Sequence, residues 1–213
     1  MKLLTNITTK ALTLPILSLM LTTACVGTSP KENFYTLNSL QPADNQQQAV
    51  VKSLPNASIN ISAVTIIEVV DRPQIVIKLA PNQVKILEQQ RWAQPLKNEI
   101  GRIVAQNLSI LLNTRHVTAY PTSAMNTKLA TNLTAYKVQL NVQQFDSNLG
   151  SNAAVTINYT VRRLSDNQMS SDTITNNQPI TSNNFNDLVE AQSKALSNIS
   201  HEIAKTIAGM AIN

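Results

Sequence analysis

The chain has 213 residues, one cysteine, four glycines and a net charge of +5 at neutral pH, and 43% of its residues are hydrophobic. This length suits one domain with a substantial core, and a single cysteine excludes a disulfide within the chain. The basic residues are scattered, without a dense run or interleaved aromatic side chains. The composition therefore argues against a nucleic-acid-binding protein.

Residues 1–24 predict a lipoprotein signal peptide. Lys2 and Lys10 flank a start without acidic residues, and the apolar stretch 11–21 is too short for a stable transmembrane helix. Ala24 precedes Cys25, which is typical of cleavage before a cysteine that becomes acylated. A plain signal peptide that happens to contain a cysteine and a buried free thiol are the alternatives. We predict a lipid anchor at Cys25, and loss of both lysines leaves a net charge of +3.

The residues that follow predict a tether and the membrane in which the protein is anchored. Residues 25–32 are polar and lack an apolar period, so they suit a short link between a membrane and a folded domain. Val26 occupies the position at which similar bacterial lipoproteins usually need aspartate to stay at the inner membrane. The outer membrane, facing the periplasm, is therefore the predicted location.

Residues 33–213 predict a single domain that begins with several strands. Alternating or compact apolar residues favour strands at 33–37, 59–69, 74–79 and 84–89, a short strand at 115–120, a hairpin of 136–145 with 155–161, and a last strand at 169–175. A polar loop covers 41–48, and a turn at 80–83 separates two of the strands. The three consecutive segments between 59 and 89 suggest antiparallel neighbours.

Two amphipathic helices are predicted among these strands. Pro95 opens the first at its first helical position, and apolar residues at steps of three and four continue to about Leu112. Asn183 or Asn184 caps the second, whose apolar residues recur as far as Met210. The predicted fold is α+β, a two-layer sandwich with a mostly antiparallel sheet and both helices on one face.

Residues suited to catalysis are few. His116 and His201 are the only histidines, and neither has a second ligand or a nucleophile at motif spacing. Glu68 and Asp71 form a conceivable carboxylate pair, but charges at a strand end are usually solvated. No glycine-rich phosphate loop or hydrolase motif is present in the sequence. We predict no enzymatic activity, no cofactor and no metal.

Arg91 and the single tryptophan, Trp92, stand at a junction between strand and helix. Arginine and tryptophan are frequent in interface hot spots, so the pair is a candidate anchor for a partner protein. The structural alternative, which the position favours, is a tryptophan that fills the core at the helix start, with Arg91 bonding backbone carbonyls.

Several segments together resemble the PqiC family of auxiliary lipoproteins of ABC-type and MCE-type transport. They cover nearly the whole mature chain, and they are 34–37 (FYTL), 71–76 (DRPQIV), Glu88, 91–96 (RWAQPL), Asn107-Leu108, 142–146 (VQQFD) and the returning strand 155–161. Gln94 departs from the pattern, because an acidic residue often precedes the proline there.

The resemblance implies an outer-membrane lipoprotein that docks a periplasm-spanning MCE protein, which works with an inner-membrane partner and carries lipids or other hydrophobic molecules. Asp71, Arg72, Arg91 and Trp92 are the candidate partner-binding residues. Edge strands at 34–37 or 169–175 could pair with a partner strand or with a second copy, giving a homo-oligomer. The rival functions are an outer-membrane assembly or pilot lipoprotein and a carrier of single lipids.

Overall fold

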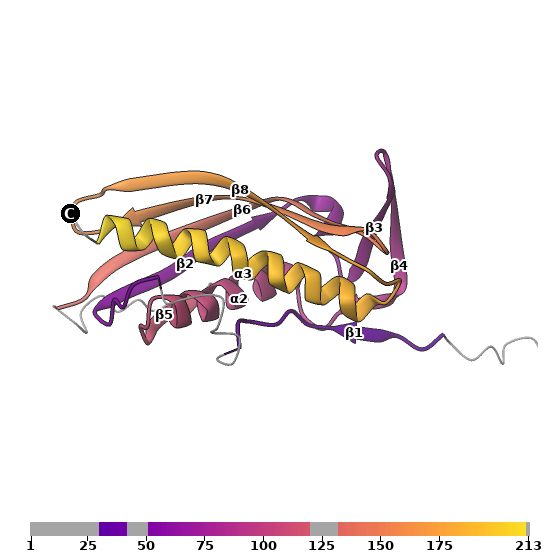
Figure 1. Ribbon diagram of the computed structural model, residues 1–213, viewed down its shortest axis with the longest axis horizontal. Coiled ribbons are helices and arrows are strands. Elements are labelled where there is room, and N and C mark those ends of the chain that lie inside the picture. Colours follow the sequence, from indigo (N-terminus) through magenta and orange to yellow (C-terminus); the bar gives the residue numbers. More distant parts are fainter. Residues whose placement is uncertain (1–29, 42–50, 120–131, 212–213) are drawn as a thin grey trace, which may run out of the picture. The chain divides into compact units, whose positions relative to one another are not determined.

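The computed structural model describes residues 30–41, 51–119 and 132–211 (Figure 1). The predicted signal peptide, Cys25 and most of the tether lie outside these residues. The chain divides into two compact units, Met1–Lys31 and Glu32–Asn213, and the second is the domain described below. Its elements, in chain order, are β1 (Asn33–Tyr35), β2 (Ala57–Ile66), the 3-10 helix η3 (Glu68–Val70), β3 (Gln74–Ala80), β4 (Gln83–Trp92), α2 (Leu96–Leu111), β5 (His116–Ala119), β6 (Thr134–Asn148), β7 (Asn152–Arg163), β8 (Met169–Pro179) and α3 (Phe185–Met210).

The larger sheet has five strands in the order β5-β2-β6-β7-β8. Its longest pairings, β6 with β7 and β7 with β8, are antiparallel, as the predicted hairpin requires. The central strand β2, however, runs parallel to both β5 and β6. Parallel neighbours need a crossover connection, and the chain supplies one through β3, β4 and α2. The α+β class is confirmed, and the sheets are mixed.

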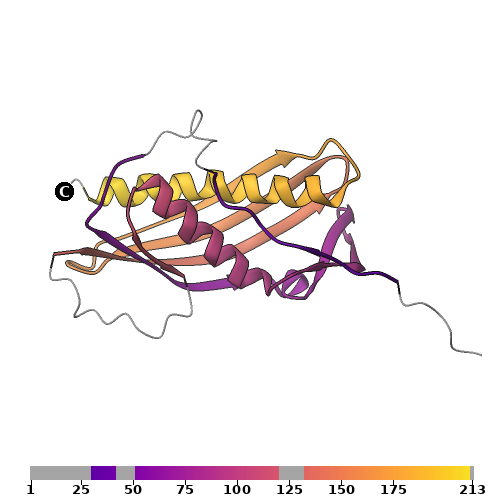
Figure 2. The same ribbon diagram turned by 90° about the horizontal axis from the view of Figure 1, so that it is seen from below.

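Both helices cover the same face of this sheet, as predicted (Figures 1 and 2). Asn184 is the N-cap of α3, and its side-chain oxygen accepts a hydrogen bond of 2.9 Å from the Asn186 amide. Pro95 lies one position earlier than predicted, at the N-cap of α2, where its carbonyl accepts hydrogen bonds from the amides of Asn98 and Glu99. The core between helices and sheet is mainly apolar, from Ile59 on β2 to Ile203 on α3, and a few buried polar side chains, Glu99 and Asn107 among them, interrupt it.

The long alternation predicted over 59–69 ends early. Ile59 and Ile61 are buried, but the β2–β6 register shifts between Ile61 and Ala63. Beyond this irregularity the residues of β2 no longer alternate between buried and exposed, and Glu68–Val70 form a 3-10 helix instead of a strand. A one-residue register shift exchanges the two faces of a strand, which explains the failure of the pattern.

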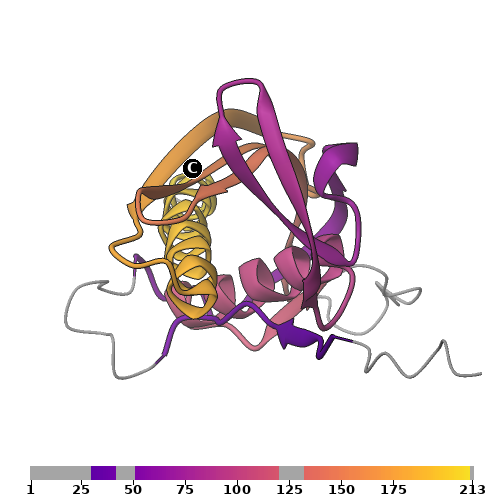
Figure 3. The same ribbon diagram turned by 90° about the vertical axis from the view of Figure 1, so that its right-hand side faces the viewer.

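A smaller sheet, in the order β1-β4-β3, lies at the end of the domain opposite the C-terminus (Figures 1 and 3). β4 is the central strand, antiparallel to β3 on one edge and, over its last three residues, parallel to β1 on the other edge. The antiparallel pairing predicted for β3 and β4 is confirmed, whereas β2 belongs to the other sheet. The β3–β4 register shifts between Gln74, which pairs with Arg91, and Ile75, which pairs with Leu87, so Arg91 has β3 on one side and β1 on the other beside an irregular segment.

Candidate partner-binding surface and tether junction

The four residues predicted to bind a partner lie at the C-terminal end of β4, where it has β1 on one edge and the start of β3 on the other. Phe34 of β1 pairs with Arg91, and the next residue along β1 pairs with Trp92. The Trp92 amide donates a hydrogen bond of 2.7 Å to the carbonyl of Pro73, which directly follows Asp71 and Arg72. Backbone pairing therefore brings the four residues to one end of the small sheet.

Trp92 itself points into the core. Only 5% of its surface is exposed, and its ring packs edge-on against Phe145 with ring centroids 6.3 Å apart. The structure thus agrees with the structural alternative for this residue. Trp92 can support the surface above it, but it offers a partner little area of its own.

The three charged residues form the outer part of this surface. Arg91 pairs with Glu32 at 2.5 Å, and Asp71 pairs with Lys97 at 3.7 Å. Ion pairs at this exposure contribute about 0–1 kcal/mol, so a partner's charges can replace them at small cost. Because Arg91 pairs with Glu32, it binds a carboxylate here, not the backbone carbonyls that the structural alternative assigned to it. The Nε atom of Arg72 is buried and has no hydrogen-bond partner among the described residues.

Exposed apolar side chains, which the sequence analysis missed, lie on the same small sheet. The most exposed of its large apolar residues are Phe34 (61%) on β1, Leu79 (54%) on β3, and Val84 (48%) and Ile86 (38%) on β4. The only other large apolar residues exposed to this degree in the described part of the chain are Leu164 and Met169. Phe34 lies beside Arg91 at one end of the sheet, and Leu79, Val84 and Ile86 lie toward the β3–β4 turn. Exposed apolar side chains gathered in this way near a turn are typical of a contact surface.

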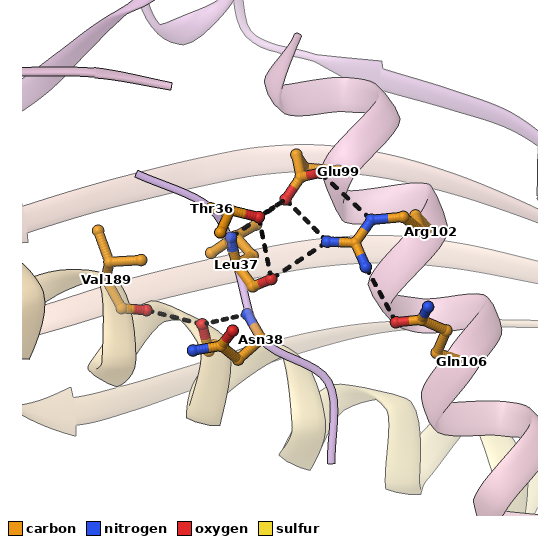
Figure 4. Close-up of polar contacts among 8 residues, drawn as sticks. Thr36, Leu37, Asn38, Glu99, Arg102, Gln106 and Val189 are labelled. Atoms are coloured by element: carbon orange, nitrogen blue, oxygen red, sulfur yellow. Dashed lines mark hydrogen bonds and ion pairs between the residues drawn. The ribbon is translucent and has the colours of Figure 1, made fainter. Parts of the chain in front are cut away.

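The segment after the tether, residues 36–40, lies across both helices and is named the strap (Figures 2 and 4). On the α2 side, Glu99 accepts hydrogen bonds from the Thr36 hydroxyl (2.8 Å) and the Leu37 amide (3.1 Å). Arg102 closes the contact by donating to the Leu37 carbonyl at 3.1 Å and to Glu99 at 2.9 Å. The Leu37 side chain is buried in the core.

Two further contacts hold the rest of the strap. The Asn38 amide donates to the Ser193 hydroxyl of α3 at 3.1 Å. The Leu40 amide donates to the side-chain oxygen of Asn107 on α2 at 2.8 Å, and Asn107 in turn donates to Ser200 of α3 at 3.2 Å. Side chains of both helices thus satisfy the strap's backbone amides, and the strap ties the two helices together.

The charge of Glu99 is stabilised despite complete burial of the residue. Burial raises the pKa of this carboxyl. The hydrogen bonds from Arg102, Thr36 and the Leu37 amide, together with the charge of Arg102, lower the pKa by more than burial raises it, so the net pKa lies below the ordinary value. The sequence held one signal for this site. Glu99 falls at helical spacing between Leu96 and Ile103, within the apolar stripe.

Glu99→Gln should lower the free energy of unfolding by about 1–3 kcal/mol, because Arg102 loses its charged acceptor. A lowered carboxyl pKa stabilises the fold above the ordinary glutamate pKa, and this contribution is lost as pH falls through the folded-state value. The difference between wild type and variant, measured by urea unfolding, should therefore shrink in acid. Glu202→Gln, which removes an exposed ion pair with Lys205, is the control and should change stability by less than about 0.5 kcal/mol. Equal effects of the two variants would contradict the role of Glu99.

The described residues contain no group of three or more His, Cys, Asp or Glu side chains placed to hold a metal ion. His116 begins β5, and His201 lies in α3, where burial lowers its pKa. Asp71, one member of the conceivable carboxylate pair, is instead paired with Lys97. Within the described part of the chain, no helix is both long and apolar enough to cross a membrane.

Comparison with solved structures supports the fold. The crystal structure of an uncharacterized protein is 13% identical, covers 84% of this chain and 99% of its own, and has a TM-score of 0.63. The crystal structure of protein XCC0632 from Xanthomonas campestris is 17% identical, covers 81% of this chain and 93% of its own, and has a TM-score of 0.58. At these identities the likeness concerns the fold alone. No curated protein sequence matches the chain significantly.

The family comparison concerns the sequence itself. The profile of the family described as the ABC-type transport auxiliary lipoprotein component matches residues 35–204, which include every element of the domain from the end of β1 to most of α3. This confirms the resemblance found in the sequence. The chain belongs to the family of ABC-type transport auxiliary lipoprotein components, the PqiC-like lipoproteins.

Proposed function

We propose that this protein is a lipid-anchored docking subunit of an MCE-type intermembrane transport system. In this proposal Cys25 holds it in the outer membrane, and the domain faces the periplasm and binds the end of an MCE conduit for lipids or other hydrophobic molecules. The conduit works with an inner-membrane partner, and the complex supports the integrity of the envelope. Family membership supports the transport partner, and the signal sequence supports the anchor.

The strap is the observation that carries this proposal. It begins four residues after the tether, and side chains of α2 and α3 bind its backbone. A membrane anchor that leads into such a segment holds the domain through its helical layer, within the reach of the tether, and not through a loose terminus. Confinement near a membrane raises the effective concentration of the domain for any partner that reaches that membrane.

Docking of this kind needs no chemistry from the protein, and we propose that it is not an enzyme. The surface formed by Asp71, Arg72 and Arg91 supplies charge, and Phe34 supplies an exposed aromatic ring beside it. Charged groups at the rim of an interface set specificity and the rate of association. Self-association into a homo-oligomer, through the edge of β1 or β8, would present several such surfaces around one conduit.

The proposal is tested by mild crosslinking in cells that express the full-length protein with a C-terminal tag, followed by purification and mass spectrometry. We expect an MCE-domain protein and its inner-membrane partner among the crosslinked products. Recovery of an outer-membrane barrel or a secretin alone would overturn the proposal in favour of an assembly or pilot lipoprotein. A bound lipid in the purified protein, without an MCE partner, would favour a single-lipid carrier.

Arg91→Glu should reduce recovery of the crosslinked MCE protein several-fold, because it reverses a charge at the proposed interface and repels Glu32. Arg162→Glu provides the matched control, since Arg162 is an exposed arginine on β7 whose side chain bonds Asn167. Recovery with the control should equal that of the wild type. A loss of partner with Arg162→Glu but not with Arg91→Glu would move the interface to the open face of the large sheet.

A further inference from the structure

The β3–β4 hairpin extends past the large sheet and ends in the turn Pro81-Asn82 (Figures 1 and 3). Near its base, Ile75 and Ile77 of β3 are buried in the core. Toward the tip, Leu79 of β3 and Val84 and Ile86 of β4 are exposed instead. Leu79 borders a hollow whose other wall is formed by residues of β6, β7 and β8, and Val84 and Ile86 of β4 are left largely uncovered by the domain.

The charges next to the hairpin tip have one sign, and the first carboxylate along β4 is Glu88, nearer the base, where it accepts a hydrogen bond from Gln74. From Arg72 to Leu87 the sequence contains three cations, Arg72, Lys78 and Lys85, and no carboxylate. Lys78 is paired with Asp146 of β6 at 3.4 Å, whereas Lys85 is exposed beside the tip. Residues 79–84 carry no charge at all. An apolar, uncharged tip with a neighbouring lysine matches the chemistry of a lipid surface, where apolar groups enter the acyl boundary and cations remain among anionic headgroups.

The segment between Cys25 and the domain is long enough for the lipid anchor and the tip of the β3–β4 hairpin to reach the same membrane surface. The eight residues from Cys25 to Glu32 can span at most about 28 Å. The ten residues of β4, which lead from the side of β1 to the hairpin turn, span at most about 33 Å. The two distances are similar, and both start at the small sheet. A lipid attached at Cys25 and the hairpin tip can therefore lie in the same plane.

We propose that the tip of the β3–β4 hairpin, with Leu79, Val84 and Ile86, inserts into the surface of the membrane that holds the lipid anchor. The inference rests on the proposed lipidation of Cys25. Two points of attachment, the anchor and the hairpin, restrict the rotation that a tether alone leaves free. The hairpin therefore sets which face of the domain is turned toward a partner that approaches the membrane.

The test places an environment-sensitive fluorophore on Val84→Cys in the full-length protein, reconstituted into vesicles of phosphatidylethanolamine with a minority of phosphatidylglycerol. Cys25 is the only natural cysteine, and acylation blocks its sulfur, so the new thiol is the single labelling site. We expect emission at a shorter wavelength and quenching by nitroxide-bearing lipids that is several-fold stronger than at the control. The control is Leu164→Cys, another exposed apolar residue, beside Arg163, which contacts Met210 near the opposite end of the domain.

Equal quenching at positions 84 and 164 would overturn the proposal. A shift at position 84 that grows with protein concentration, without quenching by lipid, would also overturn it and would assign the tip to a contact between copies. The mass of the N-terminal peptide reports acylation separately. A lipidated protein without quenching at position 84 therefore contradicts the hairpin contact alone, and an N-terminal peptide without acyl chains contradicts the anchor alone.

Discussion

Cys25→Ser should abolish retention of the protein in the membrane fraction. The serine hydroxyl cannot replace the thiol as the acyl acceptor, so the variant stays unprocessed or becomes soluble. Each buried methylene of an acyl chain contributes about 0.8 kcal/mol, and two chains already give stable anchoring. The proposed contact of the hairpin tip buries only three apolar side chains, so it should not hold the protein through carbonate extraction without the acyl chains. Carbonate extraction of membranes, with immunoblotting of both fractions, measures the effect.

Val26→Asp is the matched control for the anchor. It leaves Cys25 and the cleavage site in place, so the protein should remain fully in the membrane fraction. Similar bacterial lipoproteins with aspartate at this position stay at the inner membrane, and density-gradient separation should show a shift from the outer to the inner membrane. Unchanged membrane retention of Cys25→Ser would contradict the anchor, and an unchanged gradient profile of Val26→Asp would contradict the outer-membrane location.

The helices and the long hairpin could be predicted from the sequence because each has a local pattern. Asn184 caps α3, and the alternation from Tyr136 along β6 matches a strand with one buried face. Both signals depend on neighbouring residues alone, and so tertiary context did not alter them. The alternation beginning at Ile59 was equally regular, but a shift in its pairing with β6 ended it.

The tether junction could not be predicted, because it depends on contacts between distant segments. Thr36 and Glu99 are far apart in sequence, and each alone is an ordinary polar residue. Only the path of the strap over the helices buries Glu99 and gives its carboxylate three hydrogen-bond donors. A carboxylate inside an apolar helical stripe indicates such a contact, although the stripe does not identify the partner.

The orientations of the side chains in the candidate partner-binding surface could not be predicted from the sequence either. Arg91 and Trp92 are adjacent in sequence, but strand geometry points successive side chains to opposite faces. One therefore reaches the surface and pairs with Glu32, and the other enters the core against Phe145. The exposed residues of the β3–β4 hairpin were missed because an apolar strand is usually covered by the rest of its fold.

Trp92→Ala should lower the free energy of unfolding by about 3–5 kcal/mol, the usual cost of removing a large aromatic side chain from a packed core. The cavity would lie beside Phe145 and beneath the surface that carries Arg91. Phe34→Ala is the matched control on the neighbouring strand, and because Phe34 is largely exposed it should cost less than about 1 kcal/mol. Urea unfolding of both variants measures the difference. A small loss for Trp92→Ala together with failure to bind the MCE protein would reverse the assignment and make Trp92 a contact residue.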